Sequence, residues 1–309
     1  MTAPLNAGSH DFAIETRGLT RRHGKKVAID GLDLALPRGG IHAIVGANGA
    51  GKSTLFRLLL GFLTADAGDA LILGRDSRAL SPEDRGRIGF VNEEHTLPGW
   101  MTVGAVTDMQ RRHHEGRWDE RAFHNVIGSF DLTTQQRVAQ LSRGERAGLN
   151  LAMAIGQNPE LLILDEPTLG LDVVAKRRVL DALIDGVAAD GRTILYCSHQ
   201  IEEVERLADN LVILERGKLR SFSTPDDFCD RIRLWVADVP FKGPEAEGVP
   251  GLLQHRRIEG VHHYTVIDQD ESFADFLRTH GARTIQSQSV PLDRAVDAFL
   301  TRHHAGPQG

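Results

Sequence analysis

Cysteine is scarce in this chain. Only Cys197 and Cys229 occur among 309 residues, which excludes a scaffold held together by several disulfides and favours a reducing compartment. The longest apolar stretch, LFRLLLGFL at 55–63, is far shorter than the roughly 20 residues that a membrane-spanning helix needs. The first residues also lack the basic segment and apolar run of a secretory signal. We therefore expect a cytoplasmic chain that does not cross a membrane by itself.

An excess of positive charge is absent as well. The formal net charge is −6, so the bulk balance gives no reason to expect a nucleic-acid partner. Four basic residues near the N-terminus indicate a solvated hairpin edge, with a nucleic-acid or lipid patch as the alternative: Arg21, Arg22, Lys25 and Lys26. Histidine pairs at 113–114, 262–263 and 303–304 are expected at the surface, because adjacent side chains diverge and no cysteine lies nearby at zinc spacing.

Strands and helices alternate along most of the chain. Short apolar runs between Phe12 and Leu36 predict antiparallel strands. Hydrophobic patterning predicts strands at 39–46, 70–74, 87–92, 161–166, 193–198 and 210–219, helices at 52–63, 173–189 and 201–208, and a mostly helical stretch over 102–157. This alternation predicts an α/β fold on a parallel sheet. Turn residues at 221–228 predict a boundary, followed by an α+β region with strands at 233–239 and 262–267 and helices at 271–281 and 292–304.

A glycine-rich loop leads from the strand at 39–46 into the next helix. Its sequence, GANGAGKST at 46–54, matches G-x-x-x-x-G-K-[ST] at Gly46, Gly51, Lys52 and Ser53. Glycines let successive backbone N–H groups face bound phosphates, and the helix N-terminus adds its own N–H groups. Lys52 is predicted to contact the β- and γ-phosphates, Ser53 to bind Mg²⁺, and Thr54 to lie at the α-phosphate. A glycine-rich turn without a ligand is the alternative.

Two acids end the buried strand LLILDE. They are Asp165 and Glu166, and in a parallel sheet the carboxyl ends of strands are where ligands bind. Asp165 is predicted to hold Mg²⁺, directly or through a water, and Glu166 to act as the general base for an attacking water. Acids at a strand end are common in loops, so the pair gains its meaning from the phosphate loop.

Four separated motifs, in order, resemble the nucleotide-binding subunits of ABC transporters. They are GANGAGKST, LSRGE at 141–145, LILDEPT and the histidine of YCSHQ. The resemblance covers about residues 12–220 and implies a P-loop NTPase core with an antiparallel β subdomain and an inserted α-helical subdomain at about 95–157, plus a small C-terminal α+β accessory domain at 228–309. It implies ATP and Mg²⁺ as ligands. The implied nucleotide contacts are His23, Val27, Gly46, Asn48, Gly49, Ala50, Gly51, Lys52, Ser53 and Thr54.

LSRGE resembles the family's signature, usually LSGGQ. The resemblance implies that two subunits meet head to tail, so that the signature of one closes over the γ-phosphate bound by the other. The implied contributors are Leu141, Ser142, Arg143, Gly144 and Glu145; a serine-capped helix start is the alternative. It also implies that His199 steadies the catalytic water and that Asp172 links the two sites.

Two positions depart from the family pattern. Where a glutamine usually lies near Mg²⁺, this chain offers Glu93, which can bind a hard cation through oxygen but adds negative charge; a solvated acidic turn is the alternative. Where an aromatic residue usually stacks on adenine, the chain has His23, whose ring offers less surface than a phenol.

The resemblance implies a transport motor. A second ATPase subunit, expected to be another copy of the chain, and a separate transmembrane permease are the implied partners. Leu97, Trp100 and Met101 are predicted to offer the permease an apolar contact, which would place the subunit at the inner face of the cell membrane. The C-terminal region resembles that of stand-alone exporter ATPases, which favours export; it is either a dimerising or regulatory element or a packed cap.

Two other functions stay open. A soluble ABC-type ATPase acting on ribosomes or DNA is the first, although such proteins usually carry two fused ATPase domains, a coiled coil or a basic surface. A non-hydrolysing switch is the second, and the intact set of Lys52, Asp165, Glu166 and His199 argues against it.

Overall fold

The computed structural model describes residues 11–186, 191–239 and 243–302. The chain forms two compact units, divided between Phe222 and Ser223. The expected histidine pair at 303–304, and the last residues of the helix predicted at 173–189, lie outside the described residues. None of the helices in the described ranges combines the length and the apolar character that crossing a bilayer requires.

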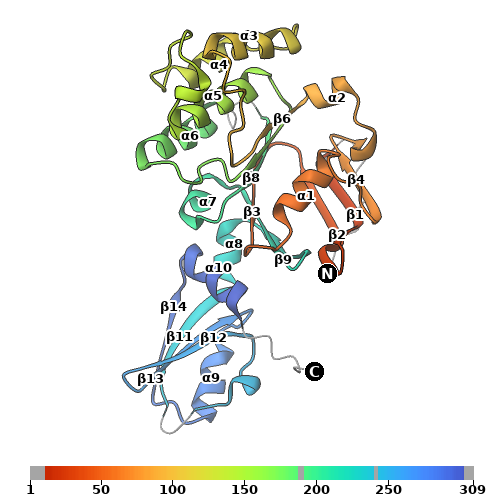
Figure 1. The fold of residues 1–309 in the computed structure, drawn as a ribbon. Helices are drawn as coiled ribbons and strands as arrows, with labels where there is room; N and C mark the ends of the chain where they lie inside the picture. Colours follow the sequence, from red (N-terminus) through yellow and green to blue (C-terminus); the bar gives the residue numbers. More distant parts are fainter. Residues whose placement is uncertain (1–10, 187–190, 240–242, 303–309) are drawn as a thin grey trace. The chain divides into compact units, whose positions relative to one another are not determined.

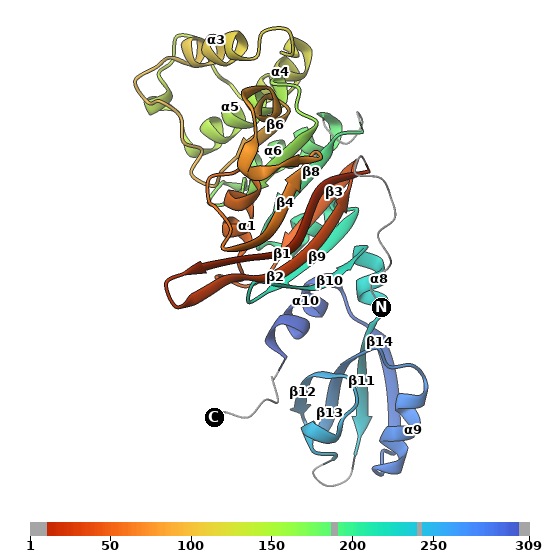
Figure 2. The same ribbon diagram turned by 90° about the vertical axis from the view of Figure 1, so that its right-hand side faces the viewer.

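The first unit contains two sheets (Figures 1 and 2). A four-stranded antiparallel sheet has the order β2-β1-β4-β5, with β1 (Phe12–His23), β2 (Lys26–Pro37), β4 (Ala67–Ile72) and β5 (Arg75–Asp76). A six-stranded sheet has the order β10-β9-β3-β8-β7-β6, with β3 (Gly40–Val45), β6 (Ile88–Val91), β7 (Leu161–Asp165), β8 (Thr193–Cys197), β9 (Asn210–Glu215) and β10 (Lys218–Ser223). Strands β9, β3, β8, β7 and β6 are parallel, as the alternating pattern predicted.

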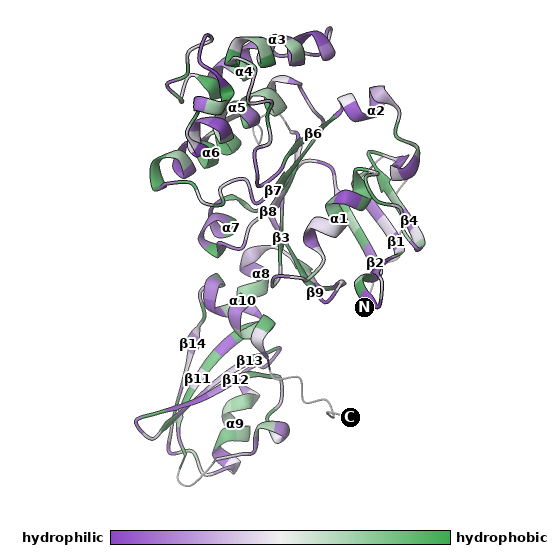
Figure 3. Ribbon diagram, in the orientation of Figure 1, coloured by the Kyte–Doolittle hydropathy of each residue, from purple (hydrophilic) through white to green (hydrophobic). Residues whose placement is uncertain are grey.

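The central strands β3, β7 and β8 of the larger sheet are buried on both faces, because they are apolar at nearly every position; Figure 3 shows them in green. On one face, α1 (Lys52–Leu59) packs between this sheet and the antiparallel sheet. The other face packs against the helical part of the unit. That part contains α3 (Val103–His113), α4 (Glu120–Ile127), α5 (Arg143–Gly156) and α6 (Val173–Gly186), with the 3₁₀ turn Val138–Gln140. The remaining elements are the 3₁₀ turn Ser77–Ala79, α2 (Pro82–Gly86) and α7 (Ile201–Leu207).

One predicted strand is in fact two. The pattern predicted a single strand at 210–219, but β9 and β10 are separated by a turn at Arg216 and Gly217, both with positive φ. A run of apolar and charged residues does not distinguish one bent strand from two, and the glycine is the only local signal of the turn.

The second unit is an antiparallel sheet with three helices. The sheet order is β12-β13-β11-β14, with β11 (Ile232–Asp238), β12 (Leu252–Ile258), β13 (Val261–Ile267) and β14 (Thr284–Ser289). The helices are α8 (Pro225–Asp230), α9 (Ser272–Thr279) and α10 (Leu292–Thr301), and a 3₁₀ turn spans Ala246–Gly248. The sequence predicted β11, β13, α9 and α10 but missed β12 and β14, whose exposed polar residues hide the alternation.

The histidine pair of β13 corrects another expectation. His262 is buried rather than exposed, and its ring lies beside those of His255 and Tyr264, nearly parallel to both. Its neighbour His263 points to the opposite face of the sheet and is half-buried. The strand period therefore divides the pair between the core and the outer face.

Candidate nucleotide site

The glycine-rich loop lies between the buried strand β3 and helix α1. Gly51 caps that helix with φ of 111°, and a Cβ there would come 2.5 Å from the carbonyl oxygen of Ala28, so only glycine fits. No side chain caps the helix and its first turn holds no acid, which leaves its N–H groups for phosphate oxygens. Lys52 is buried, and its Nζ donates to the Gly46 carbonyl at 2.7 Å.

Strand β2 runs along the loop. The side chain of Lys26 comes near Gly49, and Ala28 approaches Gly51; Val27 lies between these two residues and is half-buried. His23 is exposed and faces Lys26 across the β1–β2 hairpin. The structure thus places Val27 beside the phosphate loop and His23 at the tip of the hairpin.

The three predicted metal-binding residues, Ser53, Glu93 and Asp165, interact electrostatically. Burial raises the pKa of Asp165, hydrogen bonds from Ser53 and Cys197 partly offset the rise, and the charges of Glu93 and Glu166 add to it. A bound cation would reduce the electrostatic repulsion among these acids. No group of three or more His, Cys, Asp and Glu in the described ranges forms a metal site by itself, so Mg²⁺ would also need the Ser53 hydroxyl and phosphate oxygens.

Glu166 and His199 form a direct pair. Strands β7 and β8 are neighbours, with Asp165 opposite Cys197, so the residues that follow also lie side by side. The Glu166 carboxylate accepts from the Nδ1 of His199 at 2.7 Å and from its backbone N–H at 3.3 Å. Glu166 is 9% exposed and has φ of 50°, a conformation that costs energy in a non-glycine residue. The two hydrogen bonds hold the carboxylate next to His199 at the carboxyl ends of β7 and β8.

A buried glutamate that sequence reasoning missed holds the residues around His199 in place. Glu203, on α7, accepts from the hydroxyls of Tyr196 at 2.6 Å, Ser198 at 2.8 Å and Thr168 at 2.9 Å, and pairs with Lys176 of α6 at 3.2 Å. Ser198 in turn accepts from the N–H of Gln200 at 3.1 Å. The residues on both sides of His199 are therefore fixed. Glu202 and Glu203 are adjacent in sequence and of the same type. They differ in burial, because Glu202 is exposed and Glu203 is buried.

The signature residues begin helix α5. Ser142 and Glu145 form a reciprocal capping box: Glu145 N–H donates to Ser142 Oγ at 3.2 Å and Ser142 N–H donates to Glu145 Oε2 at 2.7 Å. Leu141 is buried. The serine therefore caps the helix, and this geometry is compatible with the trans-acting interpretation as well as with the alternative.

The signature contacts the turn around Asp172. A Cβ on Gly144 would come 2.6 Å from Ala175 Cβ, and one on Gly170 would come 2.6 Å from a guanidinium nitrogen of Arg143. Asp172 accepts from the N–H of Ala175 at 2.9 Å. Next to it, Val173 is 82% exposed, an unusual position for an apolar side chain on a packed helix.

The phosphate loop and the signature belong to different parts of the unit. Helix α1 packs in the core cluster shared with the antiparallel sheet, whereas α5 packs in the cluster of the helical part, on the other face of the larger sheet (Figure 1). The N-terminal ends of α1 and α5 thus belong to two different hydrophobic clusters.

His95 is a buried residue that sequence reasoning also missed. It is 1% exposed, and burial lowers its pKa to about 4, opposed by the backbone of Pro167 and reinforced by Arg143 and Arg146. A positive φ at His95 marks a sharp turn of the chain after Glu93.

One predicted docking residue is exposed and two are not. Trp100 is 78% exposed. Leu97 and Met101 are half-buried and pack against the core of the helical part, so Trp100 offers the most exposed apolar surface of the three, and the contact with a permease stays a prediction. Apolar side chains one or three positions apart in a loop need not share a face, because no regular period orients them.

Comparisons with known proteins agree with this geometry. The ABC transporter family profile matches residues 29–169. The daunorubicin resistance ATP-binding protein DrrA3 of Streptomyces coeruleorubidus is 36% identical over 94% of this chain and 95% of its own length. The Nod factor export ATP-binding protein I of Sinorhizobium fredii is 36% identical over 69% of this chain and 63% of its own length. A solved structure of an ABC transporter ATP-binding subunit matches 71% of this chain and 92% of its own with a TM-score of 0.64 at 24% identity.

The predicted family and the P-loop fold class are confirmed by these likenesses. The chain therefore belongs to the ATP-binding subunits of ABC transporters, the ATPases that power transport.

Proposed function

We propose that the chain hydrolyses ATP with Mg²⁺ at the carboxyl ends of strands β3, β7 and β8. The contact between Glu166 and His199 carries this proposal. Glu166 would take the proton of the attacking water, and His199 would orient that carboxylate and contact the γ-phosphate. Lys52 and the loop N–H groups would bind the phosphates. Mg²⁺, when bound by Ser53, Asp165 and Glu93, would neutralise charge on the phosphates.

We propose two domains with different roles. Residues 12–220 would form the ATPase domain, with a helical subdomain at about 95–157, and 228–309 an accessory domain. Within the ATPase domain, His23 and Val27 would lie at the adenine end of the nucleotide, and the loop residues Asn48, Gly49, Ala50, Gly51 and Thr54 along its phosphates.

The working form would be a dimer with composite sites. The separate packing of α1 and α5 supports it, since each chain would supply the phosphate loop of one site and the signature of the other. Ser142, Arg143 and Gly144 would then act in trans, with Asp172 and the exposed Val173 at the dimer contact.

Mixing two inactive variants tests the composite site. Lys52→Ala removes the phosphate lysine and Ser142→Ala removes the signature hydroxyl, so each homodimer should lose turnover. Mixed dimers would hold one intact site, which should restore about one quarter of wild-type turnover when half of the dimers are mixed. No recovery on mixing, with subunit exchange shown by labelled chains, would place both motifs in one chain's own site.

Glu166→Gln tests the general base. This variant should bind ATP, accumulate as an ATP-bound dimer and lose turnover, whereas Glu205→Gln, at an exposed position of α7, should behave as wild type. Turnover near the wild-type rate in Glu166→Gln would remove the assignment.

The partner would be a separate membrane-spanning permease, and the direction export. The similarity to a Nod factor export ATP-binding protein supports the direction. The exposed Trp100 would lie at the contact, which would place the chain on the inner face of the cell membrane. Purification of the tagged chain from detergent-solubilised membranes should yield a stoichiometric polytopic protein. Ribosomal or DNA-repair proteins in its place would favour the soluble ATPase instead.

A further inference from the structure

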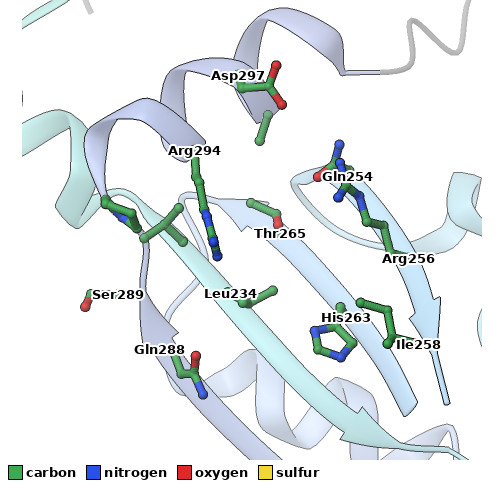
Figure 4. A pocket seen from close by; sticks show the side chains of 13 residues that line it. Leu234, Gln254, Arg256, Ile258, His263, Thr265, Gln288, Ser289, Arg294 and Asp297 are labelled. Atoms are coloured by element: carbon green, nitrogen blue, oxygen red, sulfur yellow. The ribbon is translucent and has the colours of Figure 1, made fainter. Parts of the chain in front are cut away.

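The second unit contains a cavity on the sheet face opposite α9. It has a volume of about 480 Å³ and lies between that face and α10 (Figure 4). This volume is within the range of pockets for small organic ligands. Its lining comes from all four strands and from the first turns of the helix, so the fold of this unit alone creates it.

The floor of the cavity is apolar. Leu234 of β11 is half-buried, and Val290 and Ala298 are 6% and 2% exposed. Ile258 lies at one end of the cavity and is 50% exposed, which leaves apolar surface that contact with a ligand would remove from water.

Two arginines without partners lie on the walls. The side chains of Arg256 of β12 and Arg294 of α10 are exposed and make no hydrogen bond or ion pair with another described residue. In Figure 4 the side chain of Arg294 descends from its helix toward Leu234 and Thr265. Arg231 of the same unit, by contrast, binds both oxygens of Asp268, at 2.8 and 2.9 Å. A guanidinium without a carboxylate at an apolar cavity is suited to an anionic ligand group.

The other polar walls can donate hydrogen bonds. The side chains of His263, Gln254 and Gln288 line the cavity, and none of these side chains makes a hydrogen bond to another described residue. One acid, Asp297, lies at the rim, at the end of the cavity away from His263 (Figure 4). The two arginines outnumber this acid, so the lining of the cavity carries a positive charge, although the chain as a whole carries a net charge of −6.

We propose that this cavity binds a small amphipathic organic anion: a carboxylate held by Arg256 and Arg294, with an apolar body on Leu234, Val290 and Ile258. The site is separate from the nucleotide site and does not depend on ATP hydrolysis. A medium-chain fatty acid has this chemistry.

Calorimetric titration of the full-length chain with decanoate, below its micelle concentration, tests the proposal. Decanoate should bind one site per chain, and decanol, with the same apolar body and no charge, should bind at least about tenfold more weakly. Arg256→Gln and Arg294→Gln should each weaken decanoate binding about tenfold. Arg257→Gln is the matched control, because its side chain follows Arg256 on the same strand and points to the opposite face.

A variant that fills the space separates the cavity from the charges. Gln288 is exposed, so Gln288→Trp should fold normally and block decanoate by occupying the cavity. Absence of decanoate binding to the wild-type chain would overturn the proposal. So would binding that the two glutamine variants and Gln288→Trp leave unchanged, equal affinity for decanol, or binding of anionic phospholipid vesicles without binding of monomeric decanoate, which would make the arginines a membrane contact.

Discussion

Removal of the Glu203 carboxylate should test whether this side chain fixes the backbone around His199 at the carboxyl end of β8. The buried carboxylate accepts hydrogen bonds from the hydroxyls of Tyr196, Ser198 and Thr168, and it also pairs with Lys176. Glu203→Ala would leave these donors without an acceptor inside the protein.

The expected cost follows from the count of donors. A buried donor left without a partner costs about 1–3 kcal/mol, so three hydroxyls would give about 3–9 kcal/mol if the terms were additive. Hydroxyl groups rotate and can bond to one another, so we expect the lower part of that range, about 3–5 kcal/mol, which is also typical of a broken buried charge pair. This is a large share of the roughly 5–15 kcal/mol that stabilises a domain. Glu203→Gln keeps an acceptor oxygen and should cost only about 1–2 kcal/mol.

Urea unfolding and ATPase turnover would be measured on the same variants. Glu202→Ala is the matched control, because this exposed glutamate precedes Glu203 in the first turn of α7. Glu203→Gln, measured where it remains folded, should also lower turnover, since Ser198 and Gln200 would no longer fix the backbone on both sides of His199. Equal unfolding free energies for Glu203→Ala and Glu202→Ala would refute the reasoning, as would a Glu203→Gln variant with full turnover.

Three further perturbations probe other parts of the first unit. Burial lowers the pKa of His42 below its ordinary value of 6.5, so the unfolded chain binds more protons than the folded chain near pH 6, and stability should fall as the pH drops below 6.5. In His42→Gln the unfolding free energy should therefore fall less between pH 7 and pH 5. Parallel curves of unfolding free energy against pH for the two proteins would contradict this. A Cβ on Gly148 would lie 2.5 Å from the ring of Phe130, so Gly148→Ala should destabilise the chain by about 1–3 kcal/mol in urea titrations. Burial and the nearby acids raise the pKa of the Cys197 thiol, so a thiol reagent should modify it only on unfolding. In a Cys229→Ser background, which removes the half-buried second thiol, rapid modification of the native protein would count against the placement.

The sequence by itself determined the local parts of the site. The phosphate loop depends on glycines at fixed spacing followed by a helix, and Asp165 and Glu166 end a strand whose apolar run marks it as buried. These features are set by residues within a few positions of one another, so a single chain reveals them, and the order of the motifs indicated the family. The parallel sheet followed from the alternation of strands and helices.

Tertiary structure decided what depends on strand order and register. Glu166 meets His199 because β7 and β8 are neighbours in a particular register, although the two residues are far apart in sequence. The burial of Glu203, unlike that of Glu202, depends on what packs against α7, and the cavity beside Arg294 depends on strands β12 and β14, which the polar sequence concealed. Such contacts join segments distant along the chain, and no local pattern encodes which of two adjacent side chains faces the core.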